Sequence, residues 1–244
     1  MLEIRGVTKR YGSFTAIEEV TITVPDKSVY GLVGYNGAGK TTLLKTVAAV
    51  YLPDAGEVLV DGVSAHERRT PDRTPFIVAD EPYFLPQATP NSMRSYYAGY
   101  YPEWSDGTYR NLLALFKLDG AAKLGGFSKG MQRQVAILLG LATGARTLLL
   151  DESFDGLDLS KRILLKKLLR RYAKVRNASV ILSSHNLREL EDVADYLGMI
   201  EGRRLVFDDS VESLHASHPG QSLEEIFLDE GGVTDHDLDK VFIW

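Results

Sequence analysis

The sequence predicts an α/β fold in which a sheet with parallel strands carries a phosphate-binding loop at the end of one strand. Three observations indicate this fold class. An apolar run at 28–33 precedes a glycine-rich segment, two further apolar runs at 147–150 and 179–182 end in polar residues, and helix-type apolar spacing lies between them. Alternating apolar and polar residues at 2–8 and 20–24 add half-buried antiparallel strands.

The glycine-rich segment from Gly34 to Thr42 reads Gly-Tyr-Asn-Gly-Ala-Gly-Lys-Thr-Thr and fits G-x-x-x-x-G-K-[ST] at every fixed position. Glycines let backbone N–H groups turn toward a polyphosphate, and a helix that begins near Lys40 adds the positive end of its dipole. We expect Lys40 to reach the β- and γ-phosphates and the Thr41 hydroxyl to be a ligand of Mg²⁺. The segment therefore predicts binding of a nucleoside triphosphate, with ATP preferred. The expected loop contacts are Gly34, Asn36, Gly37, Ala38, Gly39, Lys40, Thr41 and Thr42.

Length and composition predict a globular protein with one substantial core. The 244 residues are 44% hydrophobic and 25% charged, which favours a single domain over 1–244 with a small additional lobe. The net charge of −5 gives no sign of a nucleic-acid-binding surface. The chain has no cysteine, so disulfides and thiol catalysis are excluded. No signal-peptide pattern and no apolar run near the roughly 20 residues of a membrane span are present, so a membrane role requires another chain.

The apolar run at 147–150 ends in two successive carboxylates, Asp151 and Glu152. Ligands of parallel α/β sheets bind at the carboxyl edge of the strands. We expect Asp151 to hold Mg²⁺, directly or through water, and Glu152 to orient and deprotonate an attacking water. The run at 179–182 ends at Ser183-Ser184-His185, so His185 is expected at the same edge, where it can contact a γ-phosphate. A lone histidine is otherwise more often structural.

Several segments leave two interpretations open. Tyr11 either packs in the turn between the two N-terminal strands or stacks on adenine. The aromatic residues of 83–101 form either a satellite core of a helical lobe or a surface that receives a partner. The predicted helix after Ser160 has a basic face, which is solvated or meets lipid headgroups or a partner. The aromatic residues in question are Tyr83, Phe84, Tyr96, Tyr97, Tyr100 and Tyr101.

Helix starts are predicted from short polar side chains that precede apolar spacing. Asp106, Ser160 and Asn186 are the expected N-caps of three helices, the first of which spans 107–118. A further helix begins near Phe127-Ser-Lys-Gly-Met131, where Ser128 and the N–H groups around Gly130 can face an anion. As a pattern alone, this last signal is weak.

Taken in order, these motifs resemble the nucleotide-binding subunits of ABC transporters over 1–230. The resemblance implies a P-loop NTPase core, an antiparallel β lobe, a helical insert lobe at about 83–140 and a small C-terminal extension at about 208–244. It also implies that two such chains pack head to tail and enclose two ATP molecules. The expected partners are an integral membrane permease subunit and either a second copy or a paralogous ATPase. The chain is then expected to be cytoplasmic and peripheral on the inner face of the cell membrane.

The resemblance also assigns roles to residues of this sequence. Tyr11 falls where the family stacks an aromatic ring on adenine. Ser128 and Gly130 match the signature sequence that contacts the γ-phosphate of the partner's site. Asp151 and Glu152 match the Walker B aspartate and catalytic glutamate, 156–158 with Asp158 match the D-loop, and His185 matches the switch histidine.

The departures from the family pattern also carry information. Phe127-Ser-Lys-Gly-Met131 replaces Leu-Ser-Gly-Gly-Gln and is similar to variants in exporters of drugs, peptides or bacteriocins. The family's glutamine after the strand at 75–79 is replaced by Asp80, for which we expect a metal or water contact; Gln87 is too far along. Ser153 and Asp155 replace a common proline and serine.

We therefore expect an ATPase that powers an ABC exporter and docks on its membrane subunit through 83–101. Two alternatives stay open. One is a soluble ABC-type ATPase that acts on DNA or ribosomes, which the single cassette and acidic balance disfavour. The other is a nucleotide-gated scaffold with little turnover, which the departures at Asp80 and Lys129 favour and the intact Glu152 and His185 disfavour.

Overall fold

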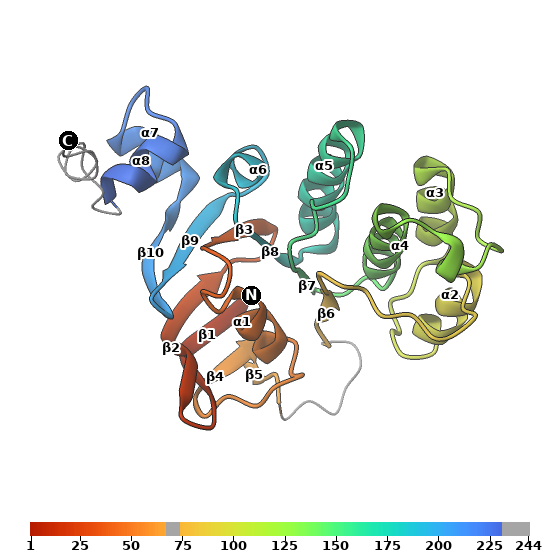
Figure 1. Cartoon of the computed structure of the whole chain (residues 1–244), viewed down its shortest axis with the longest axis horizontal. Coiled ribbons are helices and arrows are strands. Elements are labelled where there is room, and N and C mark those ends of the chain that lie inside the picture. Colours follow the sequence, from red (N-terminus) through yellow and green to blue (C-terminus); the bar gives the residue numbers. More distant parts are fainter. Residues whose placement is uncertain (67–73, 231–244) are drawn as a thin grey trace, which may run out of the picture.

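The computed structural model describes residues 1–66 and 74–230, which fold around two sheets (Figure 1). The first sheet is antiparallel and has the strand order β2-β1-β4-β5. Leu2 and Ile4 on β1 are fully buried, whereas Glu3 and Arg5, which alternate with them, are not, as the alternating pattern predicted. The strands of this sheet are β1 (Leu2–Tyr11), β2 (Phe14–Val24), β4 (Ala55–Val60) and β5 (Val63–Ser64).

The second sheet has the strand order β10-β9-β3-β8-β7-β6, in which all neighbours are parallel except β10 and β9. In this order β3, which leads into the phosphate loop, lies at the centre beside β8 and β9. The carboxyl ends of β3, β6, β7 and β8 therefore meet at one edge of the sheet. The strands are β3 (Ser28–Val33), β6 (Phe76–Val78), β7 (Thr147–Leu150), β8 (Ser179–Ser184), β9 (Tyr196–Glu201) and β10 (Arg204–Ser210).

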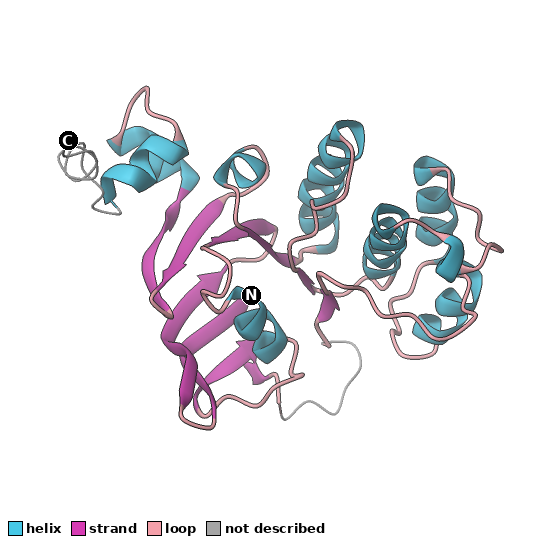
Figure 2. Cartoon of the chain, viewed as in Figure 1, coloured by secondary structure: helices cyan, strands magenta, loops and turns pink. Residues whose placement is uncertain are grey.

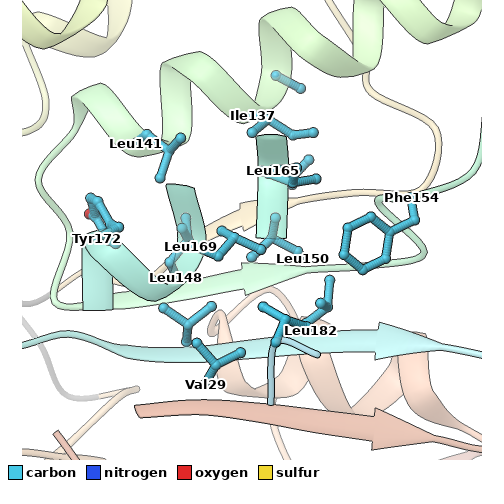
Figure 3. Packing of buried hydrophobic residues seen from close by; sticks show 14 of the residues in the cluster. Val29, Ile137, Leu141, Leu148, Leu150, Phe154, Leu165, Leu169, Tyr172 and Leu182 are labelled. Carbon is cyan, nitrogen blue, oxygen red and sulfur yellow. The ribbon is translucent and has the colours of Figure 1, made fainter. Parts of the chain in front are cut away.

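The parallel strands are buried on both faces, which explains why they read as continuous apolar runs. Leu148 and Leu150 of β7 pack into one hydrophobic cluster, while Leu149 between them packs into the other. Figure 3 shows the first cluster, where Leu148, Leu150 and Leu182 of the strands meet side chains of two helices, including Ile137 and Leu165. The second cluster joins the other face of this sheet to the antiparallel sheet and to α1.

The helices other than α1 lie away from the antiparallel sheet (Figure 2). The elements α2, α3, η2 and α4 occupy most of the expected helical insert, and α5 packs on the sheet beside them. These are α2 (Pro90–Ala98), α3 (Asp106–Phe116), the 3₁₀ helix η2 (Leu124–Gly126), α4 (Lys129–Ala142) and α5 (Leu159–Arg176). The remaining helices are α1 (Lys40–Val47), α6 (Leu187–Glu191), α7 (Val211–Ser217) and α8 (Leu223–Glu230).

Two of the predicted helix caps are wrong by one or two residues. The N-cap of α3 is Ser105, whose side chain accepts from Thr108 N, and Asp106 is the first helical residue. The N-cap of α5 is Asp158, which accepts from Lys161 N. Ser105 precedes Asp106 by one position, and Asp158 precedes Ser160 by two. Serine and aspartate are about equally good N-caps, so the sequence alone does not decide between them. Asn186 caps α6 as predicted.

Among residues 1–66 and 74–230, no helix combines the length and the apolar character that crossing a bilayer requires.

Candidate nucleotide site

The phosphate loop is held between two strands by glycines that admit no side chain. A Cβ on Gly34 would lie 2.5 Å from the Ile200 carbonyl oxygen of β9, and one on Gly39 would lie 2.6 Å from the Ala16 carbonyl oxygen of β2. Gly39 also has φ of 111°, which other residues rarely adopt. No side chain caps α1, so the N–H groups of its first turn are available to an anion.

The loop forms one wall of a cleft of about 250 Å³. The residues that line this cleft come from the β1–β2 turn, the loop itself and the ends of β6 and β7. They are Tyr11, Phe14, Ala16, Tyr35, Asn36, Gly37, Ala38, Gly39, Lys40, Thr41, Thr42, Asp80 and Glu152. Ten of these residues were predicted from the sequence as nucleotide, metal or catalytic contacts.

Lys40 lies between the loop and Glu152. Its side chain is 5% exposed, and its Nζ donates to the carbonyl oxygens of Gly34 at 2.5 Å and Tyr35 at 3.3 Å. The same Nζ is 3.1 Å from Glu152 Oε1. A desolvated ammonium in this position interacts more strongly with a nearby anion than one in water does.

Asp151 is fully buried and accepts hydrogen bonds on both carboxylate oxygens. Thr41 donates to Oδ2 and Ser183 of β8 donates to Oδ1, each at 2.7 Å. The two residues predicted to hold Mg²⁺, Thr41 and Asp151, are therefore in direct contact. Their hydroxyl and carboxylate oxygens are the ligand types that Mg²⁺ prefers, so the donor set fits this ion.

Glu152 and His185 form a second pair at the same sheet edge. His185 Nδ1 is 2.9 Å from Glu152 Oε2, and Glu152 has a left-handed φ of 44°. Burial raises the pKa of Glu152, but the hydrogen bond to His185 and the charge of Lys40 outweigh it, so the pKa lies below its usual value. The hydrogen bond to Glu152 raises the pKa of His185 above its usual value. The carboxylate is therefore held ionised, as a base requires.

Ser128, Gly130 and Asp158 lie outside this cleft. Ser128 Oγ accepts from Met131 N at 3.2 Å and so caps α4, while Asp158 caps α5. Gly130 packs on the loop after β7, where a Cβ would lie 2.5 Å from the Gly156 carbonyl oxygen. A contact of these residues with a nucleotide requires a second chain and stays a prediction.

Of the residues that line the cleft, Phe14, Ala16 and Tyr35 were not predicted from the sequence, and neither were Ser183 and Arg133, which contact site residues. Phe14, across the turn from Tyr11, lines the cleft, and the Arg203 guanidinium lies 4.6 Å from its ring centroid. Ser183 holds Asp151. Arg133 of α4 holds Asp80, whose carboxylate is paired with this guanidinium at 2.5 Å. Among these residues, only Ser183 had a sequence position that could have indicated a site residue, because it ends an apolar run.

The chain matches the ABC transporter family over residues 17–155. It is 30% identical to the Nod factor export ATP-binding protein I of Burkholderia lata over 93% of this chain and 76% of the relative. It is 27% identical to the lantibiotic transport ATP-binding protein SrtF of Streptococcus pyogenes over 93% of this chain and 96% of the relative. A solved ATP-binding subunit of an ABC transporter superposes with a TM-score of 0.85 at 24% identity, covering 95% of this chain and 99% of that one.

The chain therefore belongs to the ABC transporter family, and it is an ATPase of that family with the ABC ATPase fold. The resemblance drawn from the motifs, including the likeness to exporters of peptides and bacteriocins, is confirmed. The individual roles of the site residues stay predictions.

Proposed function

We propose that the chain hydrolyses ATP to power an exporter, by closing and reopening a head-to-tail dimer on the cytoplasmic side of a membrane permease. The observation that carries the proposal is the meeting of Lys40, Glu152 and His185 beside the Thr41–Asp151 pair at the mouth of one phosphate loop. In this family such a subunit works with a membrane partner. The proposed export direction follows relatives named for lantibiotic transport and Nod factor export, whereas another relative is named for sulfate/thiosulfate import.

Each group of residues at the site has its own role in the proposed reaction. The loop N–H groups and Lys40 bind the polyphosphate, and Tyr11 stacks on the base. Glu152, held ionised by His185 and Lys40, orients a water and accepts its proton. Thr41 and Asp151 would hold Mg²⁺, and the bound ion would neutralise charge that develops on the phosphate oxygens. Ser128, Gly130 and Asp158 of a second copy, or of a paralogous ATPase, complete the site.

The aromatic residues of 83–101 are proposed to receive the permease. Both interpretations drawn from the sequence find support here, because Phe84, Tyr97 and Tyr101 pack against the core whereas Tyr83 is 80% and Tyr100 is 60% exposed. Exposed aromatic side chains over a rigid base are typical of protein interfaces. Replacing Tyr83 and Tyr100 with serine is expected to release the chain from host-cell membranes while ATP hydrolysis in solution persists; unchanged membrane recovery would contradict this docking surface.

Steady-state phosphate release tests the ATPase mechanism. Glu152→Gln should bind ATP and hydrolyse it about 10² to 10⁴ times more slowly than the wild type, because it lacks the base. Lys40→Ala should lose ATP binding. Near-normal turnover by Glu152→Gln would remove Glu152 from the role of base, and tight binding by Lys40→Ala would contradict the loop assignment. A wild type that binds ATP without turnover would instead indicate the nucleotide-gated scaffold.

A further inference from the structure

Arg133 is a buried cation that joins three parts of the chain. It lies on the second turn of α4 and its side chain is 10% exposed. One terminal nitrogen donates to the Asp155 carbonyl oxygen in the loop after β7. The other donates to the carbonyl oxygen of Asp80 after β6 and lies 2.5 Å from the carboxylate of the same residue. A planar guanidinium is suited to such a multiple contact, which an ammonium cannot reproduce.

Asp80 stands on the boundary between two cavities. It lines the nucleotide cleft together with Lys40, Thr41 and Glu152. It also lines a neighbouring cavity of about 470 Å³, which Arg133 lines as well. The Asp80 side chain is 51% exposed, so its charge is only partly screened by water and reaches into both cavities.

A carboxylate in the wall of a polyphosphate site repels its ligand unless a cation balances it. Two acidic side chains line the described part of this cleft, Asp80 and Glu152. Each has a cation within ion-pair distance, because Lys40 contacts Glu152 and Arg133 contacts Asp80. Arg133 itself does not line the cleft, so it acts on the ligand through Asp80.

We propose that Arg133 is a positioning residue that neutralises Asp80, and thereby lets a carboxylate stand in the cleft wall without weakening the binding of a nucleoside triphosphate. This inference rests on the proposed function. It makes Asp80 the ion-pair partner of Arg133 and not a ligand of Mg²⁺. The Thr41–Asp151 pair already provides a hydroxyl and a carboxylate oxygen, and Mg²⁺ in such sites takes its other ligands from water and substrate phosphates.

The test is the dissociation constant of ATP with Mg²⁺, measured by equilibrium dialysis on the full chain. Arg133→Gln leaves Asp80 unbalanced and should weaken binding about tenfold at low salt. The loss should shrink toward 1 M salt, where charges are screened within about 3 Å. Adding Asp80→Asn to Arg133→Gln should restore affinity to within about twofold of the wild type. Arg133→Lys keeps the charge and should retain most of the affinity.

Arg110→Gln on the exposed surface of α3 is the matched control, because it makes the same change in net charge away from the cleft. Asp80→Asn alone should bind ATP at least as tightly as the wild type and with the same Mg²⁺ requirement, which tests the proposal even when Arg133→Gln does not fold. Melting curves establish that each variant is folded.

Three results would overturn the inference while leaving the proposed function intact. These are undiminished affinity in Arg133→Gln, a double variant as weak as Arg133→Gln alone, and a raised Mg²⁺ requirement in Asp80→Asn. The second would show that Arg133 acts only by packing, and the third that Asp80 is a metal ligand. Failure of the wild type to bind ATP would refute the proposed function itself and is read from the same dialysis.

Discussion

Replacing Gly130 with alanine tests how closely α4 packs on the loop that follows β7. Gly130 lies in the first turn of α4, and a Cβ there would come 2.5 Å from the Gly156 carbonyl oxygen. Real Cβ atoms essentially never come closer than 3.0 Å to such an atom. The obstacle is backbone, so no side-chain rotation relieves it, and the helix or the loop has to move by at least about half an ångström.

Two opposing effects set the magnitude. Alanine favours a helix over glycine by about 1 kcal/mol. Overpacking a close contact costs about 1–3 kcal/mol. The steric cost dominates, so we expect a net loss of about 1 kcal/mol in the free energy of unfolding, which lowers Tm by about 2–4 °C for a chain of this size. Ser128 is the N-cap of α4, so a shift of the helix start also displaces its hydroxyl from the proposed nucleotide contact. ATP hydrolysis should therefore fall about tenfold or more.

Calorimetry of the two variants Gly130→Ala and Gly126→Ala is the assay. Gly126 precedes the same helix, and a Cβ on it meets no heavy atom within 4 Å. Its replacement should leave stability unchanged or raise it by up to about 1 kcal/mol, since alanine restricts the unfolded chain. A Gly130→Ala protein as stable as Gly126→Ala would refute the close packing of α4 on this loop.

Two further predictions concern the charge pair and the core. Folding lowers the pKa of Glu152 and raises that of His185. Glu152 therefore stabilises the folded state above its unfolded pKa of 4.5, and His185 stabilises it below its unfolded pKa of 6.5. Urea denaturation should therefore show the largest loss of stability in His185→Gln between about pH 4.5 and 6.5. This loss should fade as the pH rises through the folded pKa of His185. A loss that grows above neutral pH would contradict the pairing of His185 with Glu152. Leu165→Ala in the core under α5 should cost about 2–5 kcal/mol, whereas Leu159→Ala, 73% exposed, should change stability by less than about 0.5 kcal/mol; similar losses in both would contradict the packing in Figure 3.

The sequence carries the parts of the site that are local in the chain. The glycine spacing of the phosphate loop and the carboxylates after a buried strand require only a few consecutive residues, and the structure places both at one sheet edge. Because the parallel strands are apolar on both faces, they too are visible as runs.

Contacts between distant segments are not visible in the sequence. Arg133 meets Asp80 across 53 positions and Asp155 across 22, and the sequence of α4 shows only an apolar helix pattern. Ser183 meets Asp151 because β7 and β8 pair with Leu150 opposite Leu182. Such a register depends on the packing of the whole sheet, which no local pattern specifies.

The solution mass of Glu152→Gln with and without Mg-ATP tests the central claim most directly. This variant should bind ATP without turning it over, so a closed dimer accumulates, and the mass should shift from that of the 27.0 kDa chain to twice that value when Mg-ATP is added. Such a shift would show that two copies of this chain complete each other's sites. An unchanged mass with ATP bound would contradict the self-sufficient pair, and would mean that closure needs the permease or a different second ATPase.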